Sequence, residues 1–249
     1  MADRQPVEGQ TALVTGAGKR LGRAIALALA AEGANVAVHY RSSEREAEET
    51  AELARQAGVQ AAVVQADLGR PEEAESLLER AVEAAGPIQI LINSASIFEQ
   101  DRITDATLDA LARNIQINAI APLQLARAFA RATEAGAIVN LLDAKMRDYD
   151  DIHAAYHVSK RMLFTLTRMM ALEFAPGIRV NGVAPGLILP PAGQDESYLE
   201  RLAPTNPLNT YGCAEDIADA VLFLLRGRFI TGQVIYVDGG RHMRGAVYG

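Results

Sequence analysis

The stretch from Thr11 to Gly22, TALVTGAGKRLG, decides the fold that the rest of the chain adopts. Its apolar start, Thr11–Thr15, predicts a short buried strand, and an amphipathic Ala/Leu helix follows the glycine-rich loop and stops near Gly33. A dinucleotide pyrophosphate binds in this context, because glycines let the backbone approach it and a helix N-terminus offers free N–H groups. The spacing reads Thr-Gly-x-x-x-Arg-x-Gly, with Arg20 where a middle glycine is more common.

Outward from this stretch, predicted strands and helices alternate without a linker, an internal repeat or a low-complexity segment. Apolar runs predict strands at 35–40, 59–66, 88–92, 137–142, 178–183 and 233–237, and helical patterns lie at 44–57, 71–85, 105–133, 155–174 and 214–225. This alternation predicts one doubly wound α/β domain over residues 1–249, with a parallel sheet of about seven strands and helices on both faces. The proline-rich, polar segment 187–206 predicts a lid over a site.

Composition narrows the class of partner. The formal net charge is −7, and the chain has no basic block, which argues against nucleic acid or an anionic membrane as the main partner. The longest wholly apolar run, Ala24–Ala31, is too short to span a bilayer. The start, MADRQPVEGQ, lacks the apolar core of a signal peptide, so we expect a cytoplasmic location.

The residues that most often bind metals are few and scattered. Cys213 is the single cysteine, which excludes an internal disulfide and a cysteine-rich metal site. The histidines are not spaced or paired like metal ligands; they are His39, His153, His157 and His242. We therefore expect no bound metal.

The end of the second predicted strand indicates which dinucleotide binds. The strand Asn35–Tyr40 runs into Arg41-Ser42-Ser43, whereas an acid at this position would accept the ribose hydroxyls and favour NAD. An arginine beside two serines instead supplies donors that suit a 2′-phosphate. The sequence therefore predicts NADP(H); a solvated arginine with a helix cap at Ser43 is the alternative.

A second motif, between Asp143 and Lys160, carries the candidate chemistry. Tyr156 and Lys160 are four residues apart, so on a helix their side chains lie on one face. An ammonium beside a phenol favours the phenolate, and we expect Lys160 to lower the pKa of Tyr156 toward neutrality. Asp143 follows a predicted buried strand, where open α/β sheets place their ligands, and beside Tyr156 it would form a coupled acid pair.

Two further residues invite a functional interpretation. Phe98 follows the predicted strand 88–92, where its ring could stack on a flat ligand or simply pack in the loop. Asn118 falls inside the long helical pattern 105–133, where asparagine is slightly unfavourable, so either a functional role or a surface position accounts for it.

In this order, the motifs resemble the short-chain dehydrogenase/reductase family along nearly the whole chain. The matching residues are Thr15-Gly16 through Gly22, Asp67, Asn93-Ser94-Ala95, Asn118, Tyr156-x-x-x-Lys160, Pro185-Gly186 and Asp238-Gly239-Gly240. The chain departs from the common pattern at Arg20, where glycine is usual, and at Asp143, where serine is usual. Both departures look like the pteridine reductases, and the ending Gly239–Met243 is similar to bacterial dihydromonapterin reductases.

The resemblance implies roles for particular residues. It implies a catalytic set of Asp143, Tyr156, Lys160 and Asn118, the last serving a water chain that resupplies protons. It implies cofactor contacts from Gly16, Lys19, Arg20, Leu21, His39, Tyr40, Arg41, Ser42, Asp67, Leu68, Asn93, Ser94, Ala95, Tyr156, Lys160, Pro185 and Gly186. It implies substrate contacts from Arg20, Ser96, Phe98, Asp143 and Tyr156, with Phe98 stacked on a pterin.

The sequence thus predicts an NADPH-dependent reductase that transfers hydride to a C=N bond of a pterin, of the dihydrobiopterin, dihydromonapterin or dihydrofolate type. A serine hydroxyl suits a ketone because it donates to the oxygen that gains charge, whereas a carboxylate at position 143 suits a substrate with N–H groups. The alternatives are a short-chain reductase of 3-oxoacyl or sugar carbonyls and a non-catalytic NADPH-binding protein. The resemblance also implies a homotetramer that associates through the helices around 105–133 and 155–174, and a neighbour's basic C-terminal tail over the site.

Overall fold

Seven parallel strands form a single sheet in the computed structural model, which describes residues 7–149, 151–191 and 193–244. Their order across the sheet is β3-β2-β1-β4-β5-β6-β7, so the prediction of one doubly wound α/β domain is confirmed. The strands are β1 (Thr11–Val14), β2 (Asn35–Tyr40), β3 (Ala61–Gln65), β4 (Ile90–Asn93), β5 (Gly136–Leu141), β6 (Ile178–Pro185) and β7 (Val234–Val237). The central strands β1 and β4 are buried at every residue, which explains why they read as continuous apolar runs.

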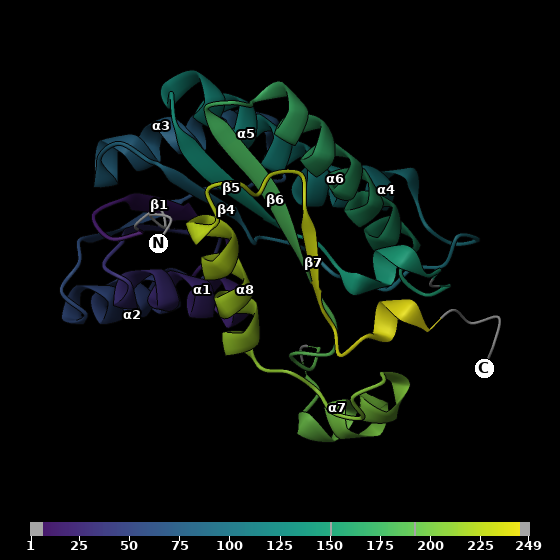
Figure 1. Cartoon of the computed structure of the whole chain (residues 1–249). Helices are drawn as coiled ribbons and strands as arrows, with labels where there is room; N and C mark the ends of the chain where they lie inside the picture. The colour runs from purple at the N-terminus through teal and green to yellow at the C-terminus, as the bar shows by residue number, and fades with distance from the viewer. Residues whose placement is uncertain (1–6, 150, 192, 245–249) are drawn as a thin grey trace.

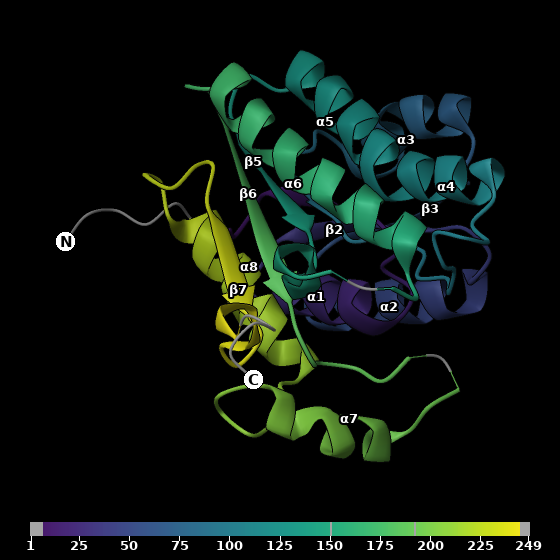
Figure 2. The same cartoon turned by 90° about the vertical axis from the view of Figure 1, so that its right-hand side faces the viewer.

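Helices cover both faces of the sheet (Figures 1 and 2). One face carries α1 (Arg20–Ala31), α2 (Glu44–Gln56) and α8 (Ala214–Arg226), and the other carries α3 (Pro71–Ala85), α5 (Ala121–Ala132) and α6 (Ala154–Glu173). The shorter helices are α4 (Leu108–Ile115), α7 (Glu196–Leu202) and the 3₁₀ turns 144–147, 203–205 and 241–243. No helix of the described ranges is both long and apolar enough to cross a membrane.

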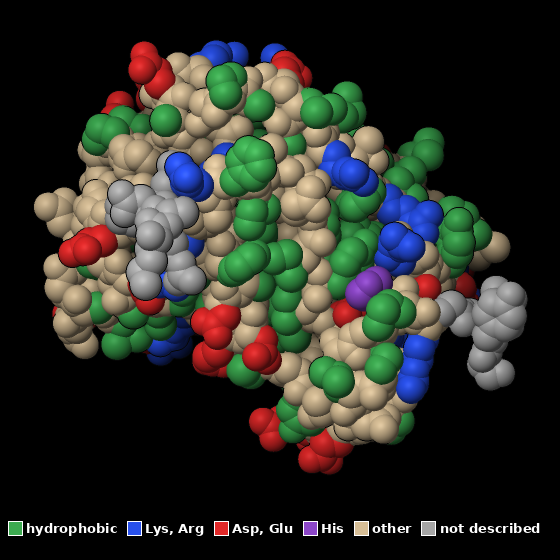
Figure 3. Space-filling model, in the orientation of Figure 1, with side chains coloured by type: hydrophobic (Ala, Val, Ile, Leu, Met, Phe, Trp, Pro, Cys, Tyr) green, Lys and Arg blue, Asp and Glu red, His purple; other side chains and the backbone are tan. Residues whose placement is uncertain are grey.

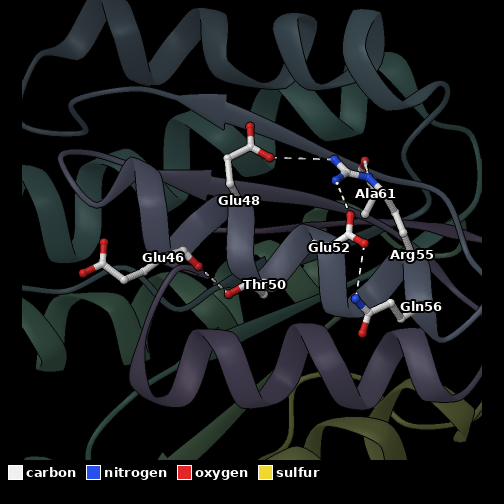
Figure 4. Close-up of polar contacts among 7 residues, drawn as sticks. All are labelled: Glu46, Glu48, Thr50, Glu52, Arg55, Gln56 and Ala61. Atoms are coloured by element: carbon white, nitrogen blue, oxygen red, sulfur yellow. Dashed lines mark hydrogen bonds and ion pairs between the residues drawn. The ribbon is translucent and has the colours of Figure 1, made fainter.

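The outer surface of α2 carries charged and polar side chains that bond to one another (Figure 4). Arg55 donates from Nε to the carbonyl oxygen of Ala61 at 3.0 Å, which ties the end of α2 to the start of β3. The same guanidinium lies 3.3 Å from Glu52 and 3.9 Å from Glu48. These ion pairs are solvent-exposed, so each contributes little to the stability of the fold.

Two segments differ from the sequence-based expectation. The pattern 105–133 is not one helix: α4 ends at Ile115, a π-helical turn spans Gln116–Ile120, and α5 begins at Ala121. A π turn inserts one extra residue into a helix and often marks a functional site. The segment 187–206 holds α7 and a 3₁₀ turn, and α7 stands apart from the sheet in both cartoon views (Figures 1 and 2).

The strand order places the candidate site. The chain crosses from β3 back to β4 beside β1, so the order reverses between β1 and β4. At such a switch point, the loops after neighbouring strands turn away from each other and leave a crevice at the carboxyl ends.

Candidate active site

A cavity of about 680 Å³ lies at this carboxyl edge and collects most of the predicted site residues. Those that line it are Gly16, Lys19, Arg20, Leu21, His39, Tyr40, Arg41, Ser42, Asp67, Leu68, Ser94, Ala95, Ser96, Phe98, Asp143, Tyr156, Lys160, Pro185 and Gly186. Residues from the loops after β1, β2, β4, β5 and β6 therefore meet in one cavity, as expected for a site at the carboxyl ends of the strands. Two predicted residues, Asn93 and Asn118, are not part of its lining.

The glycine loop after β1 requires its glycines. Gly16 has φ +66°, and a Cβ on it would stand 3.0 Å from the Ala95 Cα. A Cβ on Gly22 would lie 2.3 Å from the Gly16 carbonyl oxygen, which no side chain permits. The loop therefore keeps a bare backbone against the cavity, where a pyrophosphate would approach the first turn of α1.

His39 holds this loop through a hydrogen bond to its backbone. Its Nδ1 accepts a hydrogen bond from the Gly16 N–H at 3.0 Å, and its Nε2 lies 3.1 Å from the Ala66 carbonyl oxygen. Nδ1 therefore carries no proton and Nε2 donates. Burial lowers the pKa of His39 to about 4, so the ring is neutral at physiological pH. His39 thus fixes the loop, and because it also lines the cavity, the predicted cofactor contact stays a prediction.

The residues after β2 form a basic, hydroxyl-rich end of the cavity. Arg41, Ser42 and Ser43 all line it, in keeping with the donors that a 2′-phosphate requires. Lys19 also lies there, but its Nζ is 2.8 Å from Glu46 on α2, so its charge is already partly neutralised. The donor set at this end fits a phosphorylated adenosine ribose.

Arg20 links the glycine loop to the segment after β6. Its φ is +55°, in the left-handed region that glycine adopts readily and a side chain does not, which accounts for the glycine usual at this position. Its Nη2 donates to the Pro190 carbonyl oxygen at 2.8 Å. The arginine therefore joins the two sides of the cavity across a sequence separation of 170 residues.

Asp143 and Tyr156 form a short hydrogen-bonded pair in the middle of the cavity wall. The Tyr156 hydroxyl donates to Asp143 Oδ2 at 2.7 Å, while Asp143 Oδ1 accepts from the Lys145 N–H at 2.7 Å. The second bond caps the 3₁₀ turn 144–147, so the carboxylate is held in place by local backbone. Burial, and then the charge and hydrogen bond of Asp143, raise the pKa of Tyr156 well above its ordinary value, so the phenol keeps its proton.

Lys160 is buried beside this pair, and its ammonium donates to the backbone. Its Nζ donates to the Leu141 carbonyl oxygen at 2.8 Å and lies 5.7 Å from the centre of the Tyr156 ring. Burial lowers the pKa of Lys160 to about 8. The role of Lys160 in lowering the pKa of Tyr156 stays a prediction. One of the three ammonium donors is used, and the others remain for a ribose.

Asn93 and Asn118 fill structural roles instead of lining the cavity. The Asn118 amide, fully buried in the π turn, accepts from the Ile97 N–H at 2.9 Å and donates to the Ile97 carbonyl at 3.1 Å and to Ser159 Oγ at 3.0 Å. Its side chain therefore holds the 96–98 segment and has both amide protons engaged. Asn93 donates to Asn140 Oδ1 at 2.8 Å inside the sheet.

Phe98 is held beside the acid pair by its ring contacts. Its centroid lies 4.1 Å from His153 in a stacked arrangement and 4.7 Å from Tyr156 in an edge-to-face arrangement. Even so, 47% of the side chain stays exposed, and it lines the cavity. A flat ligand beside Tyr156 would therefore meet an aromatic wall.

Several lining residues gave no usable signal in the sequence. Tyr198 and Leu202 come from α7, Leu189 precedes it, and Arg241 comes from the 3₁₀ turn after β7. Sequence periodicity cannot tell which side chain of a short irregular segment turns toward a ligand. Across the described ranges, acidic, histidine and cysteine side chains form no cluster able to hold a metal ion.

Comparisons with known proteins agree with this geometry. The family described as enoyl-(acyl carrier protein) reductase matches residues 16–242. The crystal structure of FolM alternative dihydrofolate reductase 1 from Brucella canis, complexed with NADP, is 33% identical with a TM-score of 0.90, covering 98% of both chains. The 3-oxoacyl-[acyl-carrier-protein] reductase FabG of Staphylococcus epidermidis is 33% identical over 250 residues, which is 94% of this chain and 99% of that protein.

A third relative acts on another substrate class. The angucycline C-6 ketoreductase LanV, solved with bound NADP, is 31% identical with a TM-score of 0.89, covering 96% of this chain and 98% of LanV. These relatives share the fold over nearly their whole length and are all named as reductases. The chain is an oxidoreductase that belongs to the short-chain dehydrogenase/reductase family.

Proposed function

We propose that the protein is an NADPH-dependent reductase that reduces a C=N bond of a dihydropterin. The observation that carries this proposal is the pairing of Tyr156 with a carboxylate, Asp143, in the cavity wall. A carboxylate has about four lone-pair positions, and the Tyr156 and Lys145 bonds occupy two of them. The remaining positions can accept from the ring N–H and amino groups of a pterin. Phe98 supplies a face on which that ring can stack.

The same carboxylate is poorly suited to a ketone. A carbonyl oxygen has no proton to donate, and it gains negative charge as the carbon is reduced. An ionised Asp143 beside that oxygen would repel the developing charge, whereas a ring nitrogen that must gain a proton is helped by it. Asp143 therefore favours a C=N bond over a C=O bond.

The cofactor fits the opposite end of the cavity. NADPH bound there would supply the hydride to the carbon of the C=N bond. Arg41, Ser42 and Ser43 would hold the 2′-phosphate, the Gly16 loop the pyrophosphate and Lys160 the nicotinamide ribose. Tyr156 would deliver its proton to the ring nitrogen, so that one C–H and one N–H bond replace the C=N π bond. Its raised pKa keeps the phenol protonated at neutral pH, and the ring nitrogen must become basic as hydride arrives for the proton to move.

Reduction of a carbonyl substrate is the second candidate. Similarity to FabG and LanV, at nearly the same identity as to FolM, supports it. In that case Asp143 takes the place of the serine that is usual at this position in the family. It would have to be protonated in order to donate a hydrogen bond to the carbonyl oxygen of the substrate.

The decisive experiment measures loss of NADPH absorbance with dihydrobiopterin, dihydromonapterin, dihydrofolate and a 3-oxoacyl thioester. We expect turnover of at least one pterin, and Tyr156→Phe should reduce it by about 10²–10⁴-fold, as expected for loss of a general acid. Asp143→Ser should reduce pterin turnover and leave NADPH affinity unchanged. Asp151→Ser, which breaks only an exposed ion pair with Arg102, is the matched control.

The outcomes separate the candidates. Turnover of the thioester alone, maintained in Asp143→Ser, would refute the pterin proposal and establish the carbonyl alternative. NADPH binding without oxidation by any of these substrates would support a non-catalytic cofactor-binding protein.

We also propose that the chain forms a homotetramer. On α4 and α6, Leu108 and Leu172 are each 84% exposed and Met169 is 57% exposed, and association through these helices would bury them. Hydrophobic side chains are also scattered over the face that carries α8 and β7 (Figure 3). Phe223, on α8, is 57% exposed. The segment 187–206 would then act as a lid within each subunit, tethered by Arg20. The C-terminal residues 245–249, expected to reach a neighbour's site, lie outside the described ranges.

A further inference from the structure

Arg241 is a cation in the cavity wall that the proposed reduction does not use. It lies in the 3₁₀ turn after β7, far along the chain from the glycine loop and the Arg41 end of the cavity. Within the described ranges, no hydrogen bond, ion pair or ring contact engages its guanidinium. Half-buried, charged and unpaired, it is placed to accept an anion from the cavity.

The turn that carries Arg241 is held firmly by Asp238. This carboxylate is 1% exposed and accepts from the Gly240 N–H at 2.9 Å, the His242 N–H at 2.7 Å and the His242 ring at 2.9 Å. The His242 ring in turn stacks on Tyr236, with centroids 4.1 Å apart. The acid closest to Arg241 in sequence is thus committed to its own turn, and Arg241 is presented on a fixed backbone with no partner for its guanidinium in the part of the chain that the structure describes.

The wall around Arg241 indicates what kind of group it would meet. The side chains that α7 and the segment before it contribute to the cavity, Leu189, Tyr198 and Leu202, carry no charge. The lining also holds the guanidinium groups of Arg20, which already donates to the Pro190 carbonyl oxygen, and of Arg41, which the proposed 2′-phosphate site uses, so Arg241 is left for a substrate arm. A guanidinium forms two parallel hydrogen bonds with a carboxylate or a phosphate, which a neutral hydroxyl chain cannot match.

We propose that Arg241 selects dihydropterins whose side arm carries an anionic group, either a carboxylate or a phosphate ester. This inference rests on the proposed function and names the substrate class of the same site. Neutral dihydrobiopterin would still be reduced at the acid pair, but an acidic conjugate would bind more tightly.

Matched ligand pairs test the proposal. One pair is dihydrofolate and its neutral diamide, and the other is dihydroneopterin monophosphate and dihydroneopterin. Dissociation constants are measured by calorimetry on the NADP⁺ complex, and kcat is measured separately. We expect the charged member of at least one pair to bind more tightly, and Arg241→Gln to weaken it about tenfold, as for loss of a charge-assisted hydrogen bond. The neutral members and kcat should change little, and Arg241→Lys should retain part of the preference.

The control variant is Arg147→Gln, which removes the same charge from an exposed residue outside the cavity wall. Which pair shows the preference identifies the anion as carboxylate or phosphate. Equal affinities within both pairs, or an Arg241→Gln variant that weakens charged and neutral members alike, would overturn the proposal. Absent turnover of every pterin would overturn the proposed function instead, and the dissociation constants would still report on Arg241.

Discussion

Burying Lys160 weakens the fold, and a pH-dependent unfolding experiment can measure by how much. The side chain is 4% exposed, and burial lowers its pKa from 10.5 to about 8. This difference corresponds to about 3 kcal/mol of unfavourable interaction of the charged form with the folded protein. Replacement by methionine, which is similar in length and apolar, removes the buried charge.

The sign of the effect follows from proton binding. Between about pH 8 and pH 10.5 the unfolded chain binds more protons at this residue than the folded chain, so the free energy of unfolding of the natural protein rises with pH there. At about pH 7 nearly the whole of this roughly 3 kcal/mol opposes folding, and at about pH 9.5 only about 1 kcal/mol remains. The stability advantage of Lys160→Met should therefore shrink by about 2 kcal/mol between these pH values.

Urea unfolding of both proteins, without cofactor and at one protomer concentration, measures this change. The comparison isolates the lysine because pH-independent losses, such as the bond to the Leu141 carbonyl, cancel between the two conditions. Lys19→Met, at a lysine whose side chain is 53% exposed, is the control, and its difference from the natural protein should stay constant. A Lys160→Met difference that also stays constant would show that the buried ammonium is not destabilised and would refute the reasoning. Turnover should be lost in Lys160→Met regardless.

Two other predictions concern the fold and the assembly. The pKa of His39 is lowered to about 4, so between about pH 4 and 6.5 the unfolded chain binds more protons at this residue than the folded chain. Acidification from about pH 7 to about pH 5 should therefore lower the free energy of unfolding by about 2 kcal/mol. Urea unfolding of His39→Gln should lack that part of the loss, and an equal loss would contradict the neutral-ring assignment. Leu172→Glu places a charge on the exposed face of α6, so it should reduce the mass measured by light scattering below that of a tetramer. A natural protein whose measured mass is already that of a monomer would contradict the tetramer proposal.

The sheet was predictable because parallel strands are buried on both faces. All seven strands fall within two or three residues of their predicted limits, and α3 coincides with the predicted range 71–85. Such strands need continuous apolar runs, and the connections need turn residues. The order of apolar and turn residues along the chain therefore separates the strands from the connections. Gly16 was predictable from the glycine-rich motif, because its backbone adopts a φ of +66°, which favours glycine.

The rest of the site depends on contacts between distant segments. Nothing near Asn118 in sequence announces the π turn or the bonds to Ile97 and Ser159 that occupy its amide. Likewise, the spacing of Tyr156 and Lys160 places them on one face of α6, but it cannot reveal that the ammonium donates to Leu141. Spacing fixes neighbours along a helix, whereas hydrogen-bond partners and burial depend on the tertiary structure.

The cavity concentrates features that are unfavourable for folding. Arg20 adopts a left-handed backbone that disfavours a side chain by about 1–2 kcal/mol, and Lys160 is a buried ammonium. Both positions face the cavity, where function can favour an unfavourable local arrangement. Asp143 fits this pattern, because a serine would cap the same turn with less charge beside Tyr156. A carboxylate at that position, beside the phenol that supplies a proton in the proposed reaction, fits the proposed dihydropterin, which brings N–H groups of its own.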